Sequence, residues 1–272
     1  LTQLVRYAQE VGGEDSGAND RGLAHVIGRR VARLDEADRA LLETVAVAGR
    51  PLSQKLALAA AGGVARPLST FARLRGADLI RTHGARDADD VEPYHDRVRE
   101  QVVGALSPEA LQNRHRSLAI ALVAAGETDP EPLARHFAGA GDAQKAAVHA
   151  RTAAARALET LAFDRAAEFL ALALAGEARP VERQAIQVQR AEALAATGRC
   201  AEAAPLLLEA ADGSRGGELV ARSSESSRGT DLRARAAELL LISGRAGDGL
   251  DQLRRALHDV GLSVPRGERM AL

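Results

Sequence analysis

A pattern that recurs three times in the second half of the chain restricts the fold more than any other feature. Each copy has an alanine-rich segment, a tight turn, and a second segment that opens with small residues and carries leucines at helical spacing. The second and third copies match at Ala191 and Ala237, Leu194 and Leu240, Gly198 and Gly244, Ala203 and Gly249, and Leu207 and Leu253, 46 residues apart. The first copy runs from Ala154 through Phe163 to Ala173, 37 residues before the second (Phe163 to Cys200). The recurrence predicts stacked pairs of helices, because one such pair alone leaves an apolar face open.

The spacing of the copies is close to that of a tetratricopeptide unit, a helix-turn-helix of about 34 residues with glycine at its turn. The larger spacing arises from Gly213 to Gly229, a run rich in Gly, Ser and Arg that includes the serine-rich stretch 223–227. We expect this run to be an inserted loop. Residues 107–272 are therefore predicted to form a tetratricopeptide-like α-solenoid whose concave surface binds a protein partner or ligand. The alternative is irregular helical packing without a partner.

The first half of the chain has a different order of elements. Asp35 can cap a helix that ends at Gly49, and two short helices are expected over 52–61 and 68–75. Residues 77–83 and 91–94 then flank a polar, Asp-rich turn, which predicts a two-stranded wing. Three short helices followed by a hairpin predict a winged-helix-like domain over residues 34–106. This hairpin is the only β structure that we expect.

Composition supports a mainly α protein and argues against nucleic acid as the partner. Aromatic residues make up 2% of the 272 residues, whereas strands usually draw on aromatic and β-branched side chains. The formal net charge of -1 gives no general attraction for phosphates. The single cysteine, Cys200, fits a reducing cytosol, and no apolar run has the ~18 residues of a membrane span. We expect a cytoplasmic protein, and the initial Leu1 suggests a piece of a longer one.

Motifs of catalysis are missing from the sequence. The only lysines, Lys55 and Lys145, do not follow a glycine-rich phosphate loop, and there is no His-Glu-x-x-His, Cys-x-x-Cys, Gly-x-Ser-x-Gly or kinase signature. The seven histidines have no metal-ligand spacing, and His115 lies on an apolar helix face, where we expect a core or rim histidine. This chain by itself is not expected to be an enzyme.

One motif follows the predicted wing at the start of a helix: Tyr94-His95-Asp96-Arg97-Val98. It resembles the Met-His-Asp motif of STAND-type signalling ATPases, with Tyr94 in place of the methionine. In that family the motif lies in a winged-helix domain and its histidine contacts the β-phosphate of ADP in the closed, inactive state. The resemblance implies that His95 and Asp96 form an ADP sensor in the full-length protein. An imidazole at a helix N-terminus can bind an anion together with free backbone N–H groups.

The order of the domains is similar to that of large bacterial proteins that join a Ser/Thr protein kinase, a predicted AAA ATPase of the STAND class and helical repeats. The phrases at 45–52 (VAVAGRPL) and 161–167 (LAFDRAA) resemble segments of those proteins. This implies that residues 1–33 belong to the helical lid of an upstream nucleotide-binding domain. ATP or ADP with magnesium would be bound by the parent protein, whose phosphate loop and magnesium-binding acids would precede residue 1; no cofactor is expected for this fragment.

Two alternatives for these motifs remain open. His95 and Asp96 can be an ordinary capping pair in a surface turn. The protein can also be a DNA-binding transcriptional regulator that uses its winged helix, since Arg66, Arg73 and Arg75 surround the third predicted helix. Salt-dependent duplex binding that is lost when these arginines are replaced would identify a DNA-binding regulator.

Overall fold

The computed structural model describes residues 25–83, 89–213 and 222–262, and it is mainly helical with one small antiparallel sheet. The chain divides into two compact units. The first ends at Thr128 and includes residues 139–141, and the second comprises the rest of the chain from Asp129. In the described parts of both units, no helix is both long and apolar enough to cross a membrane.

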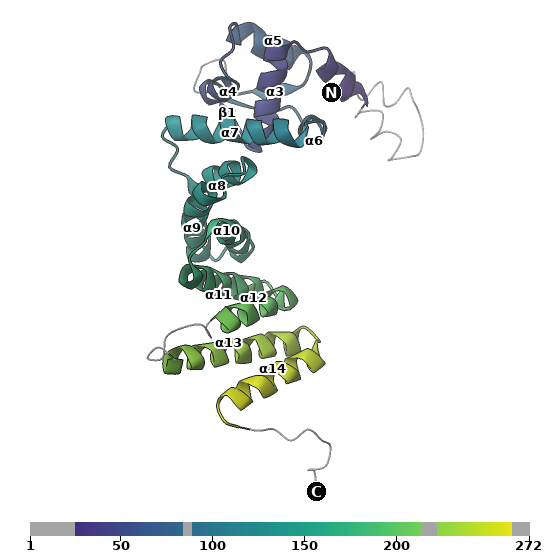
Figure 1. The fold of residues 1–272 in the computed structure, drawn as a ribbon. Coiled ribbons are helices and arrows are strands. Elements are labelled where there is room, and N and C mark those ends of the chain that lie inside the picture. Colours follow the sequence, from purple (N-terminus) through teal and green to yellow (C-terminus); the bar gives the residue numbers. More distant parts are fainter. Residues whose placement is uncertain (1–24, 84–88, 214–221, 263–272) are drawn as a thin grey trace, which may run out of the picture. The chain divides into compact units, whose positions relative to one another are not determined.

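The first unit contains the short helices and the sheet (Figure 1). Residues 25–32 are helical. The elements that follow are α3 (Glu36–Ala48), β1 (Leu52–Ser53), α4 (Gln54–Ala60), α5 (Pro67–Gly76), β2 (Ile80–Thr82), β3 (Asp90–Pro93), α6 (Asp96–Gly104) and α7 (Pro108–Ala124). The three short helices and the hairpin follow in the order expected from the sequence.

Helix α3 lies at the centre of the first unit. The side chain of Asp35 caps it by accepting the N–H of Asp38, and the helix ends at Gly49, whose φ of 67° is costly for any residue with a Cβ. Leu41 and Leu42 are fully buried in the core of this unit. Burial of each such leucine stabilises the fold by roughly 1.5–3 kcal/mol relative to exposure.

The sheet has three strands in the order β1-β3-β2, and both pairings are antiparallel. The expected wing hairpin is present as β2 and β3, with Arg81 opposite Glu92 and joined to it by an ion pair of 2.7 Å. Its expected turn at 84–88 lies outside the described residues. The expectation that the hairpin is the only β structure was wrong, because Leu52 pairs with Val91 to form β1. Two residues are too few to show the alternation that identifies a strand.

Helix α7 belongs to a different unit from the one expected when the chain was divided at residue 106. It packs on α3 and α4 within the first unit, where Leu118 is fully buried and Leu111 lies at the edge of the core. The ion pair between Arg114 and Glu43, at 2.9 Å, also joins α7 to α3. The described helical array therefore begins after α7.

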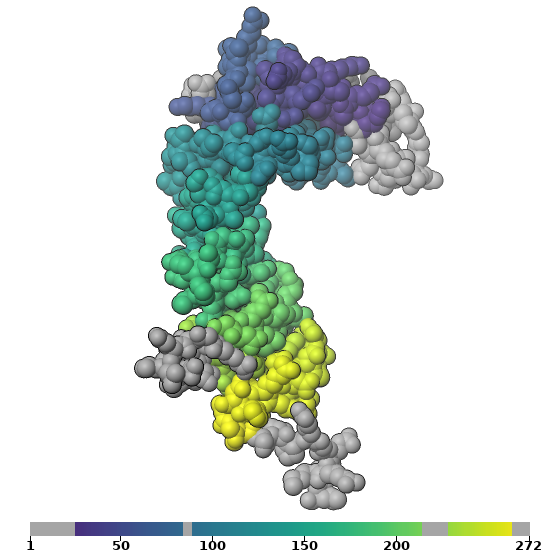
Figure 2. Space-filling view, in the orientation of Figure 1, coloured from purple at the N-terminus to yellow at the C-terminus, as the bar shows by residue number. Residues whose placement is uncertain are grey.

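The described part of the second unit is helical, and its helices follow one another along the chain (Figure 1). They are α8 (Pro130–Gly139), α9 (Ala143–Glu159), α10 (Phe163–Gly176), α11 (Pro180–Ala196), α12 (Cys200–Gly213), α13 (Arg222–Ile242) and α14 (Ala246–Asp259). From α9 to α14 each helix packs against the next one along the chain. The three recurring segments are thus three helical hairpins, α9/α10, α11/α12 and α13/α14. Figure 2 shows the same helices in a space-filling view, from teal at α9 to yellow at α14.

The turns within the hairpins share one backbone conformation. Gly198 and Gly244 have φ of 79° and 81°, in the left-handed region where glycine pays no steric cost. Leu161 occupies the corresponding place between α9 and α10 with φ of 57°, and its side chain is 70% exposed. The recurring glycines therefore identified the turns correctly, and the first hairpin uses a strained leucine instead.

The serine-rich insert is helical where the structure describes it. We expected a loop over Gly213 to Gly229, but α13 begins at Arg222 and continues to Ile242. Residues 222–228 contain neither glycine nor proline, and serine disfavours a helix by only about 0.5 kcal/mol per residue. Helix α13 as a whole packs on α12 and α14. Residues 214–221 lie outside the described residues.

Candidate functional site

His95 lies between the sheet and a helix of the first unit. Strand β3 ends at Pro93, and the N–H of Tyr94 donates to the carbonyl of Leu79 at 3.0 Å, so that the chain leaves the sheet in a defined direction. His95 then adopts an extended conformation and forms the N-cap of α6. Its Nδ1 accepts the N–H of Arg97 at 3.2 Å, and its side chain is exposed. Sequence reasoning thus placed His95 correctly at the start of a helix.

The capping bond determines which ring nitrogen of His95 can donate. Because Nδ1 accepts a hydrogen bond, the neutral ring carries its proton on Nε2. Nε2 has no hydrogen-bond partner among the described residues. The exposed imidazole therefore presents an N–H group beside the positive end of α6, an arrangement suited to a phosphate oxygen.

Asp96 is the first residue of α6, and its side chain is 87% exposed. A carboxylate oxygen of Asp96 lies 4.0 Å from Nε of Arg99. At this position the carboxylate interacts favourably with the helix dipole, but it would repel a phosphate. Asp96 therefore fits the ordinary role of a first-turn acid. His95 and Asp96 are neighbours at the start of α6.

The arginines of the third predicted helix are largely engaged within the protein. Nε and Nη2 of Arg73 donate to the two carboxylate oxygens of Asp38, each at 2.6 Å, and this hydrogen bonding raises the pKa of Arg73. Asp38 itself is 2% exposed, so that the pair anchors α5 to α3. Arg75 donates to Thr82 at 3.0 Å, and Arg66 is exposed. Arg73 is thus a structural residue in this fold, which weakens the DNA-recognition alternative.

The remaining histidines and acids of the described chain do not gather into a cluster that could hold a metal ion. His115 is half-buried on α7, and desolvation by burial lowers its pKa. That environment agrees with a histidine at the edge of the core. His149 stacks on the ring of Phe137 with 5.6 Å between ring centroids, and burial lowers its pKa as well.

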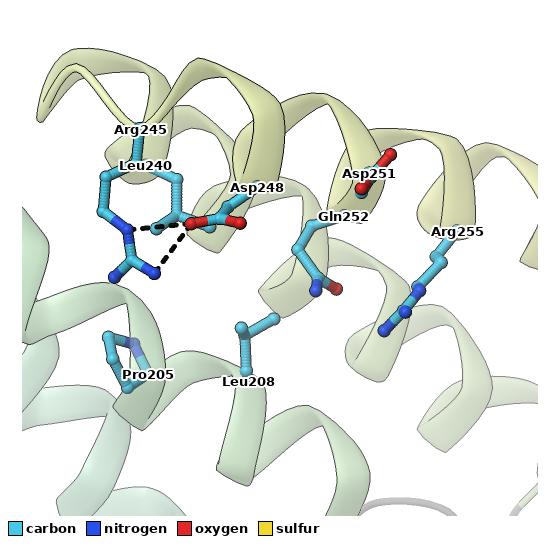
Figure 3. Close-up of a pocket in the computed structure, with 8 residues that line it drawn as sticks. All are labelled: Pro205, Leu208, Leu240, Arg245, Asp248, Asp251, Gln252 and Arg255. Carbon is cyan, nitrogen blue, oxygen red and sulfur yellow. Dashed lines mark hydrogen bonds and ion pairs between the residues drawn. The ribbon is translucent and has the colours of Figure 1, made fainter.

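The array has a cavity between α12 and α14 (Figure 3). The sequence did not predict it. It has a volume of about 280 Å³ and a mixed lining of aliphatic and charged side chains. Its residues come from three helices and are up to 50 positions apart, from Pro205 to Arg255. No local motif could have indicated it, because the cavity depends on how the last hairpin packs on the one before.

Comparisons with known proteins do not assign the chain to a family. No protein-family model, no curated protein and no solved structure matches it.

Proposed function

We propose that this chain is a regulatory, partner-binding part of a STAND-type signalling ATPase, linked in the intact protein to a Ser/Thr protein kinase. In this proposal the first unit is a winged-helix-like module that responds to the bound nucleotide. The second unit is a tetratricopeptide-like array that binds a protein partner or ligand. The chain itself carries out no catalysis, and ATP or ADP with magnesium is held by a nucleotide-binding domain in the intact protein.

The geometry of His95 carries the proposal. Its Nε2–H is exposed, it lies next to the N-terminus of α6, and its orientation is fixed by the capping bond to Arg97. These are the properties that a phosphate contact requires. The sequence around it resembles the Met-His-Asp motif, and the elements before it have the order of a winged helix. In the intact protein His95 would donate to a phosphate oxygen of ADP and so favour the closed state.

The array supports the second half of the proposal. Its hairpins are packed in series, which exposes one extended surface along many helices. The first helix of each hairpin carries a large aliphatic side chain that is well exposed: Val148 at 66%, Val181 at 74% and Ile242 at 64%. Aliphatic groups of this kind on a repeat surface provide contacts for a partner.

A switch of this type works only if each ligand has different affinities for the closed and open states. ADP would stabilise the closed state through His95, and a partner on the array would stabilise the open state. A charge-assisted hydrogen bond contributes roughly 1.5–3 kcal/mol, which changes the population of a state by about ten- to a hundredfold.

The test is the dissociation rate of ADP from the intact protein. His95→Asn keeps a good N-cap but removes the imidazole, so that α6 should form as before. We expect ADP to dissociate at least about tenfold faster and basal signalling to rise. Ser107→Ala is the matched control, since it removes the side-chain cap of α7, where Ser107 accepts the N–H of Ala110 at 3.1 Å. Unchanged ADP dissociation in His95→Asn would return His95 to a purely capping role.

A further inference from the structure

The cavity between the last two hairpins has an aliphatic floor and a polar rim (Figure 3). Pro205 and Leu208 of α12 and the buried Leu240 of α13 form the floor. Gln252 and Arg255 of α14 point from the rim toward α12 in Figure 3. Residues three apart on a helix are neighbours, so the amide and the guanidinium can reach one ligand together.

The cavity lining carries two arginines and two aspartates: Arg245, Arg255, Asp248 and Asp251. Arg245 is paired with Asp248 at 2.7 Å, and Asp251 is paired with Arg254 at 2.8 Å. Neither Arg255 nor Gln252 has a hydrogen-bond or ion-pair partner in the part of the chain that the structure describes. The lining is therefore neutral in total, but within the described residues it presents one guanidinium without a partner, that of Arg255, beside an amide that can donate a second hydrogen bond.

The charge at position 255 is not a feature of the repeat. Arg245 and Asp248 correspond to Arg199 and Glu202 of the preceding hairpin, which form the same ion pair at 2.7 Å, so that this contact belongs to the repeat. Arg255 instead corresponds to Glu209, a residue of opposite charge that accepts a hydrogen bond from Gln187 of α11 at 3.0 Å. The cation at position 255 is thus particular to the last hairpin.

We propose that this cavity is the partner-binding site of the array and that it takes an acidic peptide segment. A Glu or Asp side chain of the partner forms a charge-assisted hydrogen bond with Arg255 and accepts a second one from Gln252. An aliphatic side chain next to that acid packs on Pro205, Leu208 and Leu240. The aliphatic floor and the single unpaired guanidinium together select an acidic residue with an apolar neighbour over either group alone.

This inference rests on the proposed function of the array, but its test does not involve nucleotide. The 272-residue chain, labelled with ¹⁵N, is titrated with a capped peptide of alternating Glu and Leu whose C-terminus is amidated. A second peptide with Gln in place of every Glu is the ligand control. We expect saturable shifts of the Gln252 side-chain amide and of backbone amides in α12 and α14, with the acidic peptide only.

Two variants with the same charge change separate the site from general electrostatic attraction. Arg255→Gln should weaken the affinity for the acidic peptide at least about tenfold. Arg156→Gln, at an exposed position of α9 outside the cavity lining, should change the affinity by less than about twofold, since a distant surface charge is screened. The proposed site would be overturned if both variants weakened peptide binding equally or if both peptides bound equally well. It would also be overturned if no amide of α14 shifted at low-millimolar peptide. A negative titration with unchanged ADP sensing by His95 would leave the proposed nucleotide switch standing, so the two failures are distinguishable.

Discussion

The charged cluster around Arg233 should respond unequally to loss of its acids and loss of its base. The guanidinium of Arg233 on α13 is 5% exposed, and it donates to Asp212 of α12 at 2.7 Å and to Asp259 of α14 at 2.5 Å. The side chain of Asp212 is 68% exposed and that of Asp259 is 25% exposed. Removal of both acids would leave a buried cation without its two partners, whereas removal of the cation leaves acids that water can reach.

The expected magnitudes follow from this difference in burial. An uncompensated buried charge costs about 3–5 kcal/mol, so the Asp212→Ala/Asp259→Ala double variant should lose that much free energy of unfolding. Arg233→Met keeps most of the buried aliphatic volume and should lose about 1 kcal/mol. Urea unfolding followed by circular dichroism measures both losses, and hydrogen exchange in α12 to α14 localises them. The reasoning is refuted if Arg233→Met is as destabilising as the double acid variant.

Two further predictions concern stability in the array. Leu161→Gly should stabilise the fold by roughly 0.5–1 kcal/mol, because it relieves a left-handed φ of 57° at an exposed side chain. Gly198→Ala should destabilise the fold by about 1 kcal/mol. Thermal unfolding measures both effects, and a change of the same sign in the two variants would contradict the argument. Glu177 is buried, and hydrogen bonds from Arg179 lower its pKa from 4.5 to about 2. The stability that this carboxylate contributes should be complete above pH 4.5 and should be lost as the pH falls toward 2. The urea midpoints of wild type and Glu177→Gln should therefore converge over that range. A difference between the midpoints that stays constant with pH would show that Glu177 does not titrate in this way.

Local signals predicted the ends of several elements well. The cap at Asp35 and the glycine turn at Gly198 were recognised because each depends on one residue and its immediate neighbours. The helical start of α13 was missed because the preference of serine against a helix is weak and residues 222–228 contain neither glycine nor proline. The position of His95 could be predicted, but its tautomer could not, since the donor on Nε2 follows from the bond between Nδ1 and Arg97.

Contacts between residues that are distant along the chain could not be predicted from the sequence. The strand β1 depends on pairing between Leu52 and Val91, which are far apart along the chain. The cavity at Arg255 is lined by side chains of α12, α13 and α14, which are brought together by the packing of α13 on both neighbouring helices. Both features arise from the packing of whole elements, whereas helical periodicity reports only which face of one element is apolar.

Hydrogen–deuterium exchange on the intact protein, with and without ADP, tests the central claim most directly. The account predicts that ADP slows exchange of the amides at the start of α6, around Arg97, and that His95→Asn abolishes this protection while exchange in α14 stays the same. Exchange at the start of α6 that is identical with and without ADP, in a protein shown to bind the nucleotide, would contradict the claim that the first unit senses it.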